Sequence, residues 1–244
     1  MNVTELLTNK MRLPDFAVRN QALSEICEII INDKITKEGK LLVLDYSLKI
    51  LFVDVGKTVN NYYRSSNLCV IQCILEDNLD KNYIEDDKLV QLFSIMIEYL
   101  SLEFIELGYD NKFGMIHTLA HIADVFVTLF DYKCINNSEN FKKYFELVVD
   151  RYCSLNYVFI TDEAARILRV FNTYYINFNN VEYIIGFLDE YKSRLTKGIK
   201  GLNQRQNYYN FLHTLHFFTN DMELLRFIVE ELERKYKRYI DGIL

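Results

Sequence analysis

Residues that break helices are almost absent from this sequence, whose 244 residues include one proline, Pro14, and eight glycines. All-β sandwiches and dinucleotide-binding α/β folds use glycine and proline freely in their turns and phosphate loops. Half of the residues are hydrophobic and a quarter are charged, which is enough to build a core and excludes disordered or collagen-like chains. The chain can therefore run as one helix after another, and we predict an all-α fold.

Apolar residues recur at the spacing of a helix face in segment after segment. The links between these segments are short and are rich in asparagine and aspartate, such as Asn136-Asn137 and Asn179-Asn180. Thr36, Ser138 and Thr161 stand where helices would need caps. The predicted helices cover residues 14–32, 37–53, 59–77, 85–106, 113–131, 138–153, 161–177, 180–196, 203–219 and 221–240.

Pairs of these helices recur about every 45 residues, which is the period of HEAT and armadillo repeats. No linker rich in proline, glycine or serine divides the chain. We therefore predict one domain over residues 1–244, folded as an irregular α–α superhelix of about ten helices. A globular bundle is the alternative, although ten helices around one core would be unusual at this size.

The formal net charge is −6, so the chain lacks the basic surface that binding to nucleic acid requires. A basic stretch near the C-terminus, Arg234 to Arg238, follows Glu230, Glu231 and Glu233 on the same predicted helix. We interpret this stretch as a salt-bridged, solvated face. Nucleic acid is not an expected partner.

The five cysteines are odd in number and form no CxxC motif, which fits reduced thiols in a cytoplasmic protein. Cys69 and Cys73 share a helix face and are interpreted as core residues. The most hydrophobic segment, residues 41–55, is interrupted by charged residues, so we expect no membrane span and no membrane partner.

The most distinctive constellation in the sequence is His117, His121 and Asp124, which would lie along one stripe of the predicted helix 113–131. Two imidazoles one turn apart and a carboxylate can hold a divalent metal, the one cofactor that the sequence leaves open. Thr118 occupies the place of the glutamate in an HExxH motif, which excludes that mechanism. A polar site without metal and buried structural histidines are the other two interpretations.

If alternate helices line the concave face of the superhelix, other polar residues converge on this stripe. They are Arg64, Glu163, Arg166 and Asn210. Such a groove is a common binding surface of helical repeat proteins. The alternative is that Arg64, Glu163 and Arg166 form ordinary salt bridges between helices. A second histidine pair, His213 and His216, alternates with apolar residues and favours the core or the edge of the groove.

The stretch from Gly114 to Asp124 resembles the pattern G-[W]-x-H-x-x-x-H-x-x-D of an uncharacterised bacterial family, domain-of-unknown-function family 2785. Residues 62–67, 159–166 and 207–212 resemble further segments of that family in the same order, over about residues 15 to 220. Met115 departs from the tryptophan usual there, and His213 replaces a residue that is often basic. The resemblance implies an all-helical, repeat-like protein and supplies no reaction.

These observations leave three hypotheses for function. The first is a binding module for a protein, a peptide or a small ligand, because no complete catalytic motif occurs. The second is a metal-assisted or acid–base enzyme that uses His117, His121 and Asp124, with Arg64 or Arg166 holding an anionic substrate. The third is a HEAT-like protein that acts on DNA, which the acidic charge disfavours.

Overall fold

Apart from one two-stranded hairpin, the part of the chain that the structure describes is all-helical, as the scarcity of breakers predicts. The computed structural model describes residues 3–58, 60–103, 109–155, 158, 163–178, 180–195 and 198–240. The chain divides into two compact units, Met1–Tyr144 and Phe145–Leu244. We describe each unit by itself, so the predicted superhelix and the prediction of a single domain both stay predictions.

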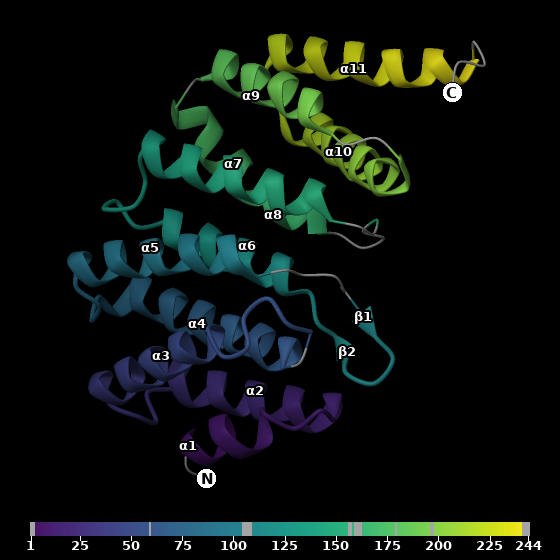
Figure 1. Ribbon diagram of the computed structural model, residues 1–244. Helices are drawn as coiled ribbons and strands as arrows, with labels where there is room; N and C mark the ends of the chain where they lie inside the picture. Colours follow the sequence, from purple (N-terminus) through teal and green to yellow (C-terminus); the bar gives the residue numbers. More distant parts are fainter. Residues whose placement is uncertain are drawn as a thin grey trace. The chain divides into compact units, whose positions relative to one another are not determined.

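The first unit begins with a short helix, α1, that continues as a single π-helical turn, η1, and neither was predicted. The helices and strands of this unit (Figure 1) are α1 (Val3–Glu5), η1 (Leu6–Lys10), α2 (Phe16–Ile31), α3 (Lys37–Leu51), α4 (Asn61–Lys81), α5 (Asp86–Leu102), β1 (Tyr109–Asp110), β2 (Gly114–Met115) and α6 (Thr118–Phe130). Helix α7 (Ser138–Ser154) crosses the division between the units.

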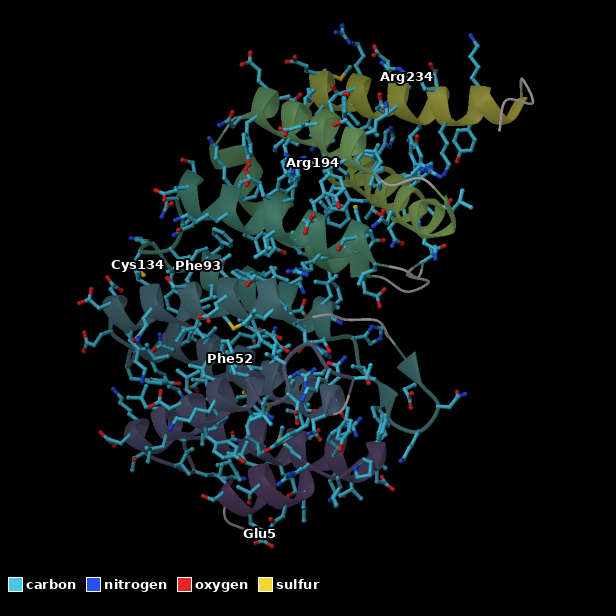
Figure 2. The ribbon with its side chains drawn as sticks, viewed as in Figure 1. Glu5, Phe52, Phe93, Cys134, Arg194 and Arg234 are labelled. Carbon is cyan, nitrogen blue, oxygen red and sulfur yellow. The ribbon has the colours of Figure 1, made fainter. Side chains whose placement is uncertain are left out.

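Two central helices, α4 and α6, organise the first unit. Helix α4 packs against α2, α3 and α6, and α6 also packs against α5. Ala120 and Ala123 are fully buried, and their small side chains let α6 approach its neighbours closely. The aromatic ring of Phe93, labelled in Figure 2, packs edge to face on the rings of Phe126 and Phe130. The distances between ring centroids are 5.6 and 5.9 Å. These helices form the rigid support of the site described below.

The second unit contains α8 (Glu163–Phe178), α9 (Val181–Arg194), α10 (Gly198–Phe218) and α11 (Met222–Ile240). Helix α10 packs against α8 and α11, and α9 packs against α11. In both units, therefore, helices pack on their second neighbours along the chain as well as on adjacent ones.

Several predicted boundaries are wrong, each for a local reason. The gap between the predicted helices 180–196 and 203–219 is too long, because α10 begins at Gly198 and includes Gly201 despite the low helix propensity of glycine. Pro14 precedes α2 rather than opening it, since Asp15 is the cap and its carboxylate accepts a hydrogen bond from the Val18 amide at 3.0 Å. The helix expected over 113–131 begins only at Thr118. The predicted cap Thr161 lies outside the described residues.

Candidate functional site

The segment before α6 is a small hairpin rather than the first turn of a helix. Strands β1 and β2 pair antiparallel, with Tyr109 opposite Met115 and Asp110 opposite Gly114. The Asp110 carboxylate accepts hydrogen bonds from the amides of Lys112 and Phe113 at 2.7 and 3.0 Å, which closes the turn. The helical spacing of apolar residues could not reveal this hairpin, because its turn is closed by the Asp110 side chain and not by the backbone hydrogen bonds of a helix.

A buried arginine and two aromatic rings anchor the hairpin to α2 and α4. Arg19 donates a hydrogen bond from Nη2 to the Phe113 carbonyl at 2.6 Å. The Phe113 ring stacks on Tyr62 with centroids 4.7 Å apart. The Arg19 guanidinium also lies 4.8 Å from the centre of the Tyr62 ring, so cation, ring and hairpin form one packed assembly.

Two further contacts fix the chain on either side of His117. The Ser65 hydroxyl donates to the carbonyl of Ile116, and the Thr118 hydroxyl donates to Asn61 Oδ1 at 2.6 Å. Ser65, Asn61 and Thr118 are all buried. Buried hydrogen bonds of this kind are costly to break, so the backbone around His117 is held in one arrangement.

His117 is therefore the cap of α6 and not a residue of its face. Its backbone is left-handed, with φ of 44° and ψ of 34°, which costs a residue other than glycine about 1 kcal/mol. The His117 and His121 rings are 6.4 Å apart and nearly perpendicular. The predicted stripe of three residues on one helix is thus wrong, since only His121 and Asp124 stand on α6.

His121 lies between a thiol and a carboxylate. Its Nδ1 is 3.4 Å from the sulfur of Cys69, on α4, and 4.0 Å from Oδ2 of Asp124. The His121 side chain is 23% exposed and that of Asp124 is 7% exposed. The imidazole thus reaches solvent while a nearly buried carboxylate lies behind it.

The surroundings of Asp124 are partly set by Tyr144 on α7. Burial raises the pKa of the Tyr144 phenol far above its ordinary value, and the negative charge of Asp124 raises it further. The phenol therefore stays neutral at physiological pH. The charge-bearing groups that these contacts bring together are consequently Cys69, His121 and Asp124, which we call the Cys69–His121–Asp124 cluster.

Within the described part of the chain, no group of three or more histidine, cysteine, aspartate and glutamate residues could hold a metal ion. The displacement of His117 from the helix removes the spacing on which the metal hypothesis depended. A metal ion at His117, His121 and Asp124 therefore stays a prediction, without the helical spacing that suggested it.

The other predicted groove residues separate into two sets. Arg64 is completely buried and binds Glu103 and three backbone carbonyls, so it lines no open surface. Glu163, Arg166 and Asn210 belong to the second unit, on α8 and α10, where Glu163 is buried and the other two are half-buried. Their convergence on His121 stays a prediction.

The second histidine pair is on α10. His213 Nε2 lies 3.1 Å from the Tyr236 hydroxyl on α11. Burial lowers the pKa of His213, and the positive charges of Lys235 and His216 lower it further. A neutral His213 that joins two helices agrees with the interpretation of this pair as core or edge residues.

Cys69 is the one member of the site that sequence reasoning assigned to the core. Its position on α4 gave no hint of a polar neighbour, because His121 follows 52 residues later and only the packing of α4 on α6 brings the two together. One feature of the sequence could have pointed to Cys69 as a site residue. Its thiol lies on the same predicted helix as the polar residues Arg64 and Asn67.

Comparison with known proteins places the chain in context. The family model described as "Protein of unknown function (DUF2785)" matches residues 51–217, a narrower span than the resemblance suggested but more than half of the chain. No curated protein and no solved structure matches the chain. Among the described residues, no helix is long and apolar enough to cross a membrane.

Proposed function

Because the chain belongs to the DUF2785 family, which carries no assigned activity, we propose a function from its own site. The protein is a binding module, and it binds a small ligand or a peptide through His117 and His121. The observation that carries this proposal is the His121 imidazole, which is 23% exposed and has a nearly buried carboxylate 4.0 Å from its Nδ1.

The rigidity of the site supports binding. The hairpin before α6 is fixed by the Arg19, Ser65 and Thr118 hydrogen bonds, so His117 and His121 are held in place before a ligand arrives. A preorganised surface loses less conformational entropy on binding than a mobile one. Residues that the surrounding structure holds in a strained, left-handed backbone conformation are also characteristic of ligand-binding sites.

Imidazoles both donate and accept hydrogen bonds, so the surface suits a ligand with polar groups rather than an apolar one. We propose a ligand that presents a carboxylate or an amide to the two rings. The chain holds only four histidines, and the two at His213 and His216 lie on the second unit. They provide matched controls within the same molecule.

The test is histidine-selective NMR of the intact protein, titrated with a panel of free amino acids, dicarboxylates and short peptides. We expect at least one compound to shift the ring resonances of His117 and His121 and to leave those of His213 and His216 in place. The shifts should disappear in His117→Asn and His121→Gln but persist in His213→Gln. If the panel moves only the His213 and His216 resonances, the site is in the wrong place.

The predicted superhelix is part of the same proposal. Second-neighbour packing, as of α2 on α4, α4 on α6 and α8 on α10, is the pattern that stacked helix pairs produce. A superhelix would bring Glu163, Arg166 and Asn210 to the same face as His121. Small-angle X-ray scattering tests this part separately, since a superhelix is longer than a globular bundle of equal mass.

An enzyme that uses acid–base or nucleophilic chemistry is the second candidate function. The contact between Cys69 and His121 favours it, because a thiol beside an imidazole is the arrangement of a nucleophile and its base. Action on DNA receives no such support. Arg234, labelled in Figure 2, pairs with Glu231 at 2.6 Å and with Glu230 at 3.4 Å, so part of the C-terminal basic stretch is neutralised.

A further inference from the structure

We propose that Cys69 and His121 form a nucleophilic thiol–imidazole pair, and that Cys69 is a site of reversible modification by small disulfides. This inference does not depend on the proposed ligand-binding function. It rests on the 3.4 Å contact between the Cys69 sulfur and His121 Nδ1, and on the fact that both side chains reach the surface.

The packing of two helices makes the pair. Cys69 stands on α4 and His121 on α6, the two central helices of the first unit. The first turn of α6 is closed by a hydrogen bond from the His121 amide to the His117 carbonyl at 2.9 Å, and the docked hairpin fixes that turn. The backbone that carries the imidazole is therefore fixed beside α4, within reach of the Cys69 thiol.

The charges around the pair favour transfer of the thiol proton. When Nδ1 of His121 takes the proton from Cys69, the resulting imidazolium lies between the thiolate and the Asp124 carboxylate, whose Oδ2 is 4.0 Å away. Two neighbouring negative charges stabilise the positive ring. The phenol of Tyr144 faces Asp124 from α7 and stays neutral, and the His117 ring lies 6.4 Å from that of His121. The thiol and the carboxylate both approach Nδ1, so Asp124 acts on the base through its charge and does not hold the opposite ring nitrogen.

The reaction with a small disulfide is balanced without any other reagent. The proton of Cys69 moves to His121, and the thiolate attacks one sulfur of the disulfide. A bond forms between the Cys69 sulfur and that sulfur, while the original S–S bond breaks. The departing thiolate takes the proton from the imidazolium, so a neutral thiol leaves and a mixed disulfide remains on Cys69.

The other cysteines are internal references. Cys134 is half-buried like Cys69, but burial and then the charge of Asp86 raise the pKa of its thiol. Figure 2 labels Cys134 at the turn after α6, at the opposite end of that helix from His117. Cys153 is buried, and its pKa is raised well above the ordinary value by burial and by Asp150.

Cys27 is the rival site. A hydrogen bond from Cys73 lowers the pKa of the Cys27 thiol, against the opposing effects of burial and Glu76. No imidazole supports it in the contacts of the described residues, so its reaction should not respond to changes at His121. This difference separates the two thiols experimentally.

The experiment exposes the intact protein to a small amount of 4,4′-dithiodipyridine between pH 6 and 8. Acid stops the reaction, and peptide mapping by mass spectrometry measures the mixed disulfide on each cysteine. We expect Cys69 to react at pH 7 roughly tenfold faster than Cys134, since thiolate fraction outweighs the lower nucleophilicity of an activated thiol. The rate at Cys69 should also level off at a lower pH than the rate at Cys134.

Two variants complete the test. His121→Gln should slow Cys69 roughly tenfold and leave Cys134 unchanged, while Cys69→Ser should remove the fast phase of thiopyridone release. Slow labelling of Cys73, a buried thiol on α4 of the same unit, shows in each variant that the first unit stays folded. If His121→Gln unfolds the chain, the pH profiles of the wild-type cysteines decide alone. The proposal is overturned if Cys69 reacts no faster than Cys134, if Cys27 reacts first, or if folded His121→Gln keeps the fast reaction.

Discussion

Arg64 and Glu103 form a two-pronged ion pair in which neither side chain is exposed to solvent. Nε and Nη2 of the guanidinium donate to the two carboxylate oxygens at 2.6 and 2.8 Å. Tyr99 donates its hydroxyl to the same carboxylate at 2.6 Å. The remaining hydrogen-bonding capacity of Arg64 goes to the carbonyls of Val53, Asp54 and Lys57. The pair therefore joins the loop after α3 to α4 and to the end of α5.

Removing one partner of this pair should destabilise the protein strongly. We expect Arg64→Met or Glu103→Gln to lower the free energy of unfolding by about 3–5 kcal/mol, because each leaves a buried charge without its counter-charge. The double variant Arg64→Met/Glu103→Gln should lose less than the two single losses added together. Urea unfolding followed by circular dichroism measures all three. A loss below about 1 kcal/mol in both single variants would contradict the structural role of the pair.

Two glycines should respond to alanine in opposite directions. Gly114 has a φ of 72°, and an added Cβ would lie 2.8 Å from a ring carbon of Phe16. Gly114→Ala should therefore cost more than about 1 kcal/mol of stability. Gly186 lies within α9, and a Cβ there would meet no atom within 4 Å. Gly186→Ala should stabilise by about 0.5–1 kcal/mol. Thermal unfolding of both variants tests this pair, and equal shifts would show that the hairpin is not held against α2.

The backbone of His117 predicts a separation of stability from ligand binding. Asparagine tolerates the left-handed region, whereas a β-branched residue does not. The free energy of unfolding of His117→Asn should thus lie within about 0.5 kcal/mol of the wild-type value. That of His117→Val should be lower by about 1–2 kcal/mol. Both should lose the ligand-induced shifts of the His121 ring in the NMR titration. Equal stability of the two variants would argue against the left-handed conformation at His117.

Acid should weaken the ion-pair network that joins α3 and α4. Hydrogen bonds from Lys40 and Lys81 lower the pKa of Asp33 to about 2. Burial tends to raise the pKa of Asp77, but hydrogen bonds from the same two lysines outweigh it and leave the pKa lowered. A lowered pKa contributes stability above the unfolded value, near 4, and that contribution disappears as the pH falls toward 2.

The matching experiment measures unfolding of wild type and Asp33→Asn in urea between pH 7 and pH 2. The difference in stability between the two should be constant above pH 5 and should shrink between about pH 4 and pH 2. A difference that persists unchanged at pH 2 would mean that the Asp33 carboxylate does not pair with Lys40 and Lys81.

The sequence was a good guide where structure follows from local chemistry. Apolar spacing located α2, α3, α7, α8, α9 and α11 to within a few residues. The cap at Thr36 forms as predicted, with its hydroxyl accepting from the Gly39 amide at 3.2 Å. Asparagine and aspartate also supply the left-handed turn positions at Asp33, Asp54, Asn60 and Asn82.

The sequence misled where a contact between distant segments overrides a local pattern. The apolar and polar spacing from Phe113 onward continues that of α6, yet Arg19 and Tyr62 draw Phe113 into a hairpin instead. In the sequence, nothing distinguishes Arg64 from an arginine that lines a binding groove. The tertiary structure shows that it is buried in an ion pair with Glu103. These contacts join residues 39 or more positions apart, a range that periodicity does not cover.

The sequence alone thus determined that the chain is helical, because the scarcity of proline and glycine and the period of the apolar residues act through each residue's immediate neighbours. It also singled out His121 and Asp124, which a helix places one turn apart. The tertiary structure decided what those residues face. Cys69 meets His121 because α4 packs on α6, and the docked hairpin turns His117 out of the helix. Side-chain chemistry is written in the sequence, but which groups become neighbours depends on packing across the whole unit.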